Sequence, residues 1–237
     1  MKILITNDDS IQAEQLLPLI RWCKQLGDVT TVVPQYEQSA KSHGIEIHKP
    51  FRVEQVQTDD GTVIYTVDST PADCVRYAVL GMGLSFDLVI SGINRGYNIG
   101  TDILYSGTVA AVREAGVLGI PAIALSTSLE YYGDAIQHLS EIFAYIRDNR
   151  LMEIHSAYNI NIPPAPQGIR ITRQGGVFYS DSFIEVEDGM YLANGICAYR
   201  ADNNPSLDTE TTLGGYISIM PVTIDMTAQD VYRQLTE

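Results

Sequence analysis

Five short apolar runs alternate with amphipathic stretches along the first 150 residues, and this alternation limits the folds open to the chain. The runs predicted as strands are 2–6, 29–33, 62–67, 88–91 and 122–126. The stretches predicted as helices are 16–26, 71–80, 107–118 and 131–150. Because consecutive parallel strands need crossover helices, this order predicts an α/β fold with a doubly wound, mainly parallel, Rossmann-like sheet. The binding crevice of such a sheet lies at the carboxyl ends of its strands.

The pattern changes after about residue 150. Two β-rich runs, 177–186 and 191–200, flank a tight turn and predict a C-terminal β-hairpin arm. Residues 213–220 predict one more strand. Residues 227–235 predict a short closing helix, with Thr227 as its N-cap.

A chain of 237 residues with 45% hydrophobic content can bury the core of one domain. We therefore expect a single α/β domain over residues 1–237. Within it, 1–150 would form the doubly wound core, and 151–237 the hairpin arm plus the C-terminal segment.

Cysteine usage and charge restrict the compartment and the partners. Cys23, Cys74 and Cys197 lie far apart and outside any Cys-x-x-Cys motif, which indicates free thiols rather than disulfides or a zinc site. The first apolar run is too short for a signal peptide, and no run reaches membrane-spanning length. These features predict a cytoplasmic protein without a membrane partner. The formal net charge of −14 argues against a nucleic-acid polymer, because binding one requires Lys and Arg to replace counterions on phosphates.

Asp8 and Asp9 stand side by side directly after the first predicted strand. Adjacent carboxylates repel each other unless a positive charge or hydrogen-bond donors offset them. Asp and Asn are also favoured at helix N-caps, so Asn7-Asp8-Asp9 could simply begin the next helix. Taken alone, the motif leaves both interpretations open.

A second polar loop, residues 91–100 (SGINRGYNIG), follows the predicted strand 88–91. Its glycines are spaced four apart and do not match the dinucleotide-binding pattern G-x-G-x-x-G. A flexible surface loop is the plain interpretation. However, glycines permit close approach of a ligand to the backbone, and Asn94 and Asn98 offer neutral oxygens suited to a hard cation.

A third stretch, residues 105–116 (YSGTVAAVREAG), places Ser106, Gly107 and Thr108 at the start of a predicted helix. Unpaired N–H groups and the positive end of the helix dipole make such a start a candidate anion site. An ordinary Ser/Thr cap explains the same residues equally well.

The loop after the second predicted strand, residues 34–44 (PQYEQSAKSHG), should reach the same edge of the sheet. Ser39 could lend an oxygen to a metal ion. Lys41, His43 and, from the neighbouring loop, Arg95 are candidates for neutralising a substrate anion.

With all of these stretches considered together, the sequence resembles the SurE family of stationary-phase survival proteins, which are metal-dependent nucleoside monophosphate phosphatases. The motifs NDD, the loop serine, TPADCV at 70–75, SGIN.G.N.G and YSGTVAA occur in the family's order, and GYISIMPVTIDMT resembles its closing segment. By this resemblance, the metal ligands are Asp8, Asp9, Ser39 and Asn94. The phosphate-contacting residues are Asn98, Ser106, Gly107 and Thr108.

The chain departs from the family pattern at two glycine positions, and Lys41 and His43 are also less usual for the family. Ser10 and Ala40 stand where the family usually has glycine. If these positions need a positive φ, each Cβ costs on the order of 1 kcal/mol.

The resemblance implies a phosphomonoesterase that releases phosphate from nucleoside 5′-monophosphates, with 3′-monophosphates and short polyphosphate left open. A non-catalytic regulator that binds metal and nucleotide is the alternative. The all-oxygen ligand set favours one Mg²⁺ or Mn²⁺ per subunit. Asp9 is favoured as the general base, and Asp8 as a covalent nucleophile is the rival chemistry. An arm that cannot bury both of its faces predicts a homodimer, with a tetramer left open.

Overall fold

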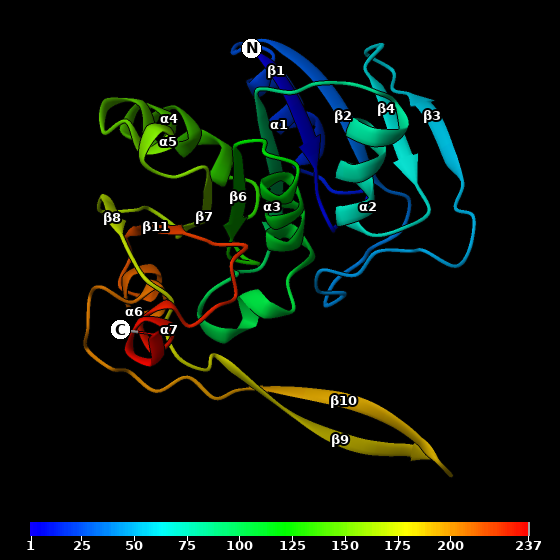
Figure 1. The fold of residues 1–237 in the computed structure, drawn as a ribbon. Helices are drawn as coiled ribbons and strands as arrows, with labels where there is room; N and C mark the ends of the chain where they lie inside the picture. Colours follow the sequence, from blue (N-terminus) through cyan, green and yellow to red (C-terminus); the bar gives the residue numbers. More distant parts are fainter. Residues whose placement is uncertain (237) are drawn as a thin grey trace.

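The computed structural model describes residues 1–236 and contains a nine-stranded sheet and a separate two-stranded hairpin (Figure 1). The strands are β1 (Lys2–Thr6), β2 (Asp28–Pro34), β3 (Val53–Gln57), β4 (Val63–Val67), β5 (Leu88–Arg95), β6 (Ala122–Thr127), β7 (Ala157–Ile162), β8 (Ile169–Ile171), β9 (Tyr179–Glu187), β10 (Met190–Cys197) and β11 (Ile217–Pro221). The helices are α1 (Leu16–Cys23), α2 (Pro71–Arg76), α3 (Gly107–Val117), α4 (Leu139–Asp148), α5 (Leu151–Ile154), α6 (Asp208–Leu213) and α7 (Gln229–Thr236).

The sheet has the strand order β3-β4-β2-β1-β5-β6-β7-β11-β8. Its six central strands, from β4 to β7, are parallel to one another. The outer strand β3 pairs antiparallel with β4, and β11 pairs antiparallel with β7. The predicted doubly wound, mainly parallel sheet is therefore confirmed, with antiparallel additions on both sides.

Helices cover both faces of the sheet, and each face has its own apolar cluster. Ile3 and Ile5 of β1 pack in the cluster that includes residues of α1 and α4, whereas Leu4 packs with α2 and α3. Because successive side chains of a strand point to opposite faces, a strand buried on both sides is apolar throughout. The carboxyl end of β1, where this apolar run stops, lies between the two layers.

The hairpin β9–β10 projects away from the sheet, and α7 lies near the C-terminus (Figure 1). Both elements confirm the predicted arm and closing helix. The helix begins at Gln229, so the predicted N-cap at Thr227 is wrong and Ala228 is the residue that precedes the helix. The side chain of Asp225 accepts hydrogen bonds from the Thr227 N–H and from the Gln229 amide.

Several predicted boundaries were wrong. The single helix expected over 131–150 is a turn, a short 3-10 segment (Ala135–His138) and α4. The strand expected over 213–220 is instead the end of α6 followed by β11. The helix expected over 71–80 is α2 continued by a wider turn over Tyr77–Gly81.

The strands β3, β7 and β8 were not predicted at all. Three strands that follow residue 150, namely β7, β8 and β11, belong to the same sheet as β1. We propose on this ground that the chain forms one domain, whose core continues past residue 150.

Asp208 is a fully buried carboxylate that connects three segments. Its oxygens accept hydrogen bonds from the N–H groups of Gly100 (3.0 Å), Gly175 (2.7 Å) and Thr209 (2.7 Å). These bonds join the loop after β5 to the base of the hairpin arm and to α6. A buried charge is tolerated when several donors satisfy it.

Asp208→Ala should lower the free energy of unfolding by about 3 kcal/mol, because it leaves buried N–H groups without an acceptor. Urea denaturation measures this loss. Asp202→Ala, at an exposed carboxylate nearby in sequence, is the control and should change the value by less than about 0.5 kcal/mol. Equal effects of the two substitutions would contradict the role given to Asp208.

Candidate active site

Three residues predicted for the site meet at the carboxyl edge of the sheet. Asp8 follows β1, Asn94 lies at the end of β5, and Thr108 is in the first turn of α3. The Thr108 hydroxyl donates a hydrogen bond to Asp8 Oδ1 and lies 3.3 Å from Asn94 Oδ1. The end of the first strand, the end of the fifth strand and the start of a helix thus converge on one point and bring together residues that the family resemblance assigned to the site.

Asp9 joins the same group through the backbone of β5. Its Oδ2 accepts a hydrogen bond of 3.0 Å from the Arg95 N–H. Asp8 is almost fully buried, whereas Asp9 is partly exposed. Asp9 is therefore the carboxylate of the pair that is more open to solvent.

A β-bulge directs Asn94 toward this point. Between β5 and β6 the register shifts, so that Ser91 pairs with Ala124 but Asn94 pairs with Ser126. Gly92 sits within the bulge at φ 137°, where a Cβ would come within 2.4 Å of the Leu125 carbonyl oxygen. Glycine is required here, and bulges of this kind commonly re-aim side chains at functional sites.

Gly107 lets α3 approach the carboxylates. A Cβ at this position would lie 2.9 Å from Asp8 Cβ and 3.0 Å from Asp8 Oδ2. Any larger residue would push the helix start away from Asp8. The positive end of the α3 dipole consequently faces the paired acids.

The environment of the paired acids disfavours their charged forms. Burial raises the pKa of Asp8, although hydrogen bonds from Thr108 oppose the shift. Burial, followed by the negative charge of Asp8, raises the pKa of Asp9 to about 6, while the Arg95 N–H opposes it. The charge of Glu37, a third carboxylate that sequence reasoning missed, raises both pKa values further.

Ser39 lies on the loop that follows β2, in the order the sequence predicted. The preceding residue, Gln38, donates its N–H to the Asp8 carbonyl oxygen at 2.8 Å, which brings this loop to the site. The Ser39 side chain is exposed, and its hydroxyl donates to Glu37 at 2.7 Å. The structure thus places Ser39 beside a residue that faces the acids and leaves its oxygen lone pairs available.

Two of the predicted phosphate-contacting residues, Ser106 and Asn98, have different hydrogen-bond partners. Ser106 caps α3, because its Oγ accepts the Val109 N–H at 3.1 Å, and its own proton remains available to a ligand. Asn98 is buried, and its Nδ2 donates to Ser126 Oγ at 2.8 Å. The backbone carbonyl oxygen of Asn98 also accepts hydrogen bonds from the side-chain amides of two buried asparagines, Asn159 and Asn161. Asn98 therefore holds the loop after β5 on the sheet.

The three candidate cations have different positions. Arg95 is exposed, its N–H bonds Asp9, and its charge lowers the pKa of Asp9. His43 instead forms a 2.8 Å pair with Glu114, in the middle of α3. Lys41 is exposed to solvent on the same loop as His43.

The two positions that depart from the family pattern both have positive φ. Ser10 lies at φ 72° and Ala40 at φ 58°. The expectation that these positions carry a Cβ in a left-handed conformation is confirmed. The same conformation would cost less with glycine.

The donors at this edge suit a hard cation. Two buried side-chain oxygens, Asn7 Oδ1 and Ser91 Oγ, have no hydrogen-bond partner among residues 1–236. Asn7 directly precedes Asp8 and Asp9 in the sequence, and Ser91 pairs with Thr6 at the end of β1. A divalent ion would offset the repulsion between Asp8 and Asp9, and it takes oxygen ligands of these types. Within the described residues no three His, Cys, Asp or Glu side chains form a group that could hold a metal, so a cation bound by Asp8 and Asp9 would need neutral oxygen ligands as well.

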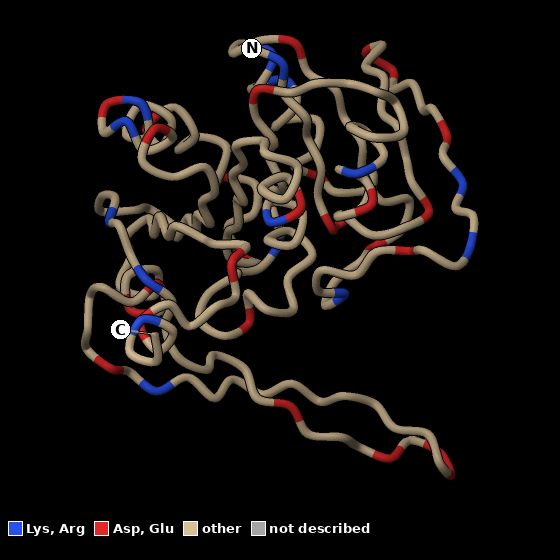
Figure 2. The backbone as a smooth tube through the Cα atoms, viewed as in Figure 1, with Lys and Arg blue, Asp and Glu red and all other residues tan. Residues whose placement is uncertain are grey.

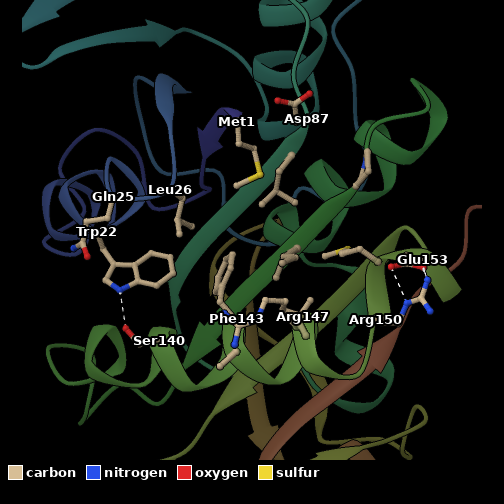
Figure 3. Close-up of a pocket in the computed structure, with 16 residues that line it drawn as sticks. Met1, Trp22, Gln25, Leu26, Asp87, Ser140, Phe143, Arg147, Arg150 and Glu153 are labelled. Carbon is tan, nitrogen blue, oxygen red and sulfur yellow. Dashed lines mark hydrogen bonds and ion pairs between the residues drawn. The ribbon is translucent and has the colours of Figure 1, made fainter.

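A cavity of about 670 Å³ lies at the opposite edge of the sheet (Figure 3). It is lined by Met1, Asp87 and Pro121, which precede β1, β5 and β6, and by Trp22 and Phe143 from the helix layer. Its walls are largely apolar. It contains none of the residues predicted for the site, and we do not assign the phosphate chemistry to it.

Fold and site together define an α/β protein with two adjacent acids and the start of a helix at the carboxyl edge of its sheet. The family described as "Survival protein SurE" matches residues 3–181. The chain is 38% identical over 248 aligned residues to "5′-nucleotidase SurE" of Caldanaerobacter subterraneus subsp. tengcongensis, covering 99% of this chain and 96% of the relative. It is 35% identical to the protein of the same name from Thermosipho africanus, covering 100% and 97%.

A solved structure has the same fold. The crystal structure of the SurE protein from Aquifex aeolicus superposes with a TM-score of 0.81 at 31% identity, covering 100% of this chain and 98% of that one. The chain belongs to the SurE family.

The raised pKa of Asp9 predicts a pH-dependent stability of the metal-free protein. A carboxyl whose pKa is higher in the folded state than in the unfolded state stabilises the fold at low pH, and this stability is lost as the pH rises through the folded pKa. In EDTA, Asp9→Asn should therefore raise the free energy of unfolding relative to wild type above about pH 7.

The difference should shrink as the pH falls below about 6, where Asp9 becomes protonated. Urea denaturation over this pH range measures it. Asp59→Asn, in the exposed turn between β3 and β4, serves as the control. A difference that does not depend on pH would show that the charge of Asp9 is not destabilising.

Proposed function

We propose that the carboxyl-edge site hydrolyses the phosphate ester of nucleoside 5′-monophosphates. The chain is a 5′-nucleotidase of the SurE family by full-length homology. The observation that carries the assignment of the site is the convergence of Asp8, Asn94 and Thr108 through hydrogen-bond contacts. Activity towards 3′-monophosphates or short polyphosphate is a further possibility for the same site.

Nucleotidases of this family depend on a metal ion, and we propose one Mg²⁺ or Mn²⁺ per subunit. The residues that would hold it are Asp8, Asp9, Ser39 and Asn94. The ion supplies Lewis acidity and a positive charge that offsets the acidic residues when phosphate approaches. In a protein with a net charge of −14, this local neutralisation is a condition for binding an anion.

The remaining side chains position the phosphate. The Ser106 hydroxyl and the N–H groups of the first turn of α3 are suited to hold its oxygens. Thr108 contributes mainly through Asp8, because its hydroxyl donates to that carboxylate. The guanidinium of Arg95 lies close enough to Asp9 to contribute positive charge at the same edge.

Asp9 is the better candidate for the general base. It is the more exposed of the two acids, and its hydrogen bond from the Arg95 N–H engages Oδ2 alone. Its Oδ1 is thus available to take a proton from the water that attacks phosphorus in line with the leaving ribose oxygen. Asp8, buried and held by Thr108, is less free to act as a covalent nucleophile. Trapping of a labelled phosphoenzyme would favour the covalent route.

Asp8→Asn and Asp9→Asn should each lower kcat/KM by about 100-fold or more, because the metal site loses a charged ligand. Phosphate release from nucleoside 5′-monophosphates measures this, with and without EDTA and after adding back Mg²⁺ or Mn²⁺. The fold should be kept in both variants, since an asparagine has nearly the same shape. Asp59→Asn is the matched control and should retain full activity.

Retained activity in both variants would refute the site assignment. If the wild-type protein released no phosphate in an EDTA-sensitive, metal-restored manner, the non-catalytic regulator would become the better description.

We also propose that the chain works as a homodimer, with tetramers left open. The hairpin arm exposes large apolar side chains on both faces, including Phe183, Ile184 and Leu192. It carries acidic residues and no Lys or Arg between residues 179 and 197 (Figure 2). An isolated hairpin is marginally stable in water, so a partner surface is expected to cover it.

Light scattering should give a mass of about two chains of 26.1 kDa. Phe183→Glu should shift the mass towards one chain, because it places a charge in the covered surface. Asp188→Asn, in the turn of the arm, is the control and should leave the mass unchanged. A wild-type mass of a single chain would contradict the proposal.

A cytoplasmic location fits the cysteines, all three of which are free. Within residues 1–236, no helix combines the length and apolarity needed to cross a membrane.

A further inference from the structure

The loop that carries Ser39 has a strained backbone. We call residues 37–44 the metal loop. Ala40 lies at φ 58° and Ser42 at φ 54°, in the left-handed region that residues other than glycine rarely adopt. Such conformations persist only when surrounding contacts hold them. The contacts of this loop should therefore matter to the site.

Two of these contacts lie next to the site itself. Gln38 donates its N–H to the Asp8 carbonyl oxygen at 2.8 Å. Ser42 donates its N–H to Tyr105 O at 2.9 Å and its hydroxyl to Leu104 O at 2.7 Å. The metal loop is thus fastened to the segment just before α3.

The third contact lies further along α3. His43 Nε2 is 2.8 Å from Glu114 Oε2, and Arg76 donates to the other oxygen, Glu114 Oε1, at 3.0 Å. The side chain of Glu114 is 5% exposed, and that of His43 is 22% exposed. A carboxylate this deeply buried is tolerated when it is paired, and each of the two Glu114 oxygens has its own partner.

Glu114 lies on the same helix as Thr108, which donates to Asp8. One rigid helix therefore fixes both a metal carboxylate and the far end of the loop that carries Ser39. The neighbouring charged residues on α2 have partners other than His43. Arg76 pairs with Glu114 and Asp73, and Asp73 accepts the N–H of Glu46, just after the loop.

We propose that His43 and Glu114 form a positioning pair that holds Ser39 where its oxygen completes the metal site. The inference rests on the proposed function, since Ser39 is a metal ligand only under that proposal. His43 is here a positioning residue that acts through the loop. It does not touch the metal or the substrate.

The test measures Mn²⁺ binding by titration calorimetry or electron paramagnetic resonance. His43→Ala should weaken Mn²⁺ binding by about tenfold, the loss typical of residues that orient metal ligands. His43→Gln should restore most of the affinity, because its amide nitrogen can reach the place of Nε2 and donate to Glu114. At saturating Mn²⁺, kcat of His43→Ala should stay within about twofold of wild type.

A double-mutant cycle tests whether the pair acts through Ser39. The variant with both Ser39→Ala and His43→Ala should bind Mn²⁺ no more weakly than Ser39→Ala alone. Effects that add would overturn the proposal. So would an unchanged affinity in His43→Ala, or a failure of His43→Gln to differ from it.

Thermal melts of each variant check that the chain is folded. If His43→Ala does not fold, Glu114→Gln, which keeps the shape of the side chain and weakens the pair, takes its place in the cycle. Mn²⁺ binding does not depend on turnover. A wild-type protein that binds Mn²⁺ without releasing phosphate would therefore contradict the proposed function alone.

Discussion

The repulsion between two adjacent carboxylates, one buried and one partly exposed, is the constraint around which this edge of the molecule is arranged. Burial raises the pKa of both Asp8 and Asp9. The charge of Asp8 raises the pKa of Asp9 further, and the charge of Glu37 raises both. Several groups approach them in response: the Thr108 hydroxyl, the Arg95 N–H and the start of α3, brought close by Gly107. These groups reduce the repulsion but leave both pKa values raised. A divalent cation would offset the remaining repulsion between the two acids and allow phosphate to bind at this edge.

Much of the fold could be predicted because the central strands carry a strong local signal. β1, β2, β5 and β6 are buried on both faces, so they read as apolar runs between amphipathic helices. β3, β7 and β8 could not be found in this way. β3 is an edge strand with mostly exposed residues, β8 spans only Ile169–Ile171, and β7 contains two asparagines. The side-chain amides of both asparagines donate to the backbone carbonyl of Asn98, a partner distant in sequence.

The site divides in the same way. Its carboxylates, amides and helix start follow strand ends, and parallel strands bring such ends together. The edge at which they lie could thus be predicted from sequence order, and the grouping of Asp8, Asn94 and Thr108 from the family resemblance. Glu37 and Glu114 could not. Their roles depend on how the loop after β2 crosses α3, which local pattern does not encode. His43 was weighed as a group for the substrate anion, yet the structure pairs it with Glu114.

The proposed function depends on a cation bound among the oxygens of Asp8, Asp9, Ser39 and Asn94. Anomalous scattering from a crystal soaked in Mn²⁺ tests for this ion. One strong peak per chain is expected within coordination distance, about 2.0–2.4 Å, of the Asp8 and Asp9 carboxylates. A peak elsewhere, or none at these residues while the protein hydrolyses nucleotides in Mn²⁺, would contradict it.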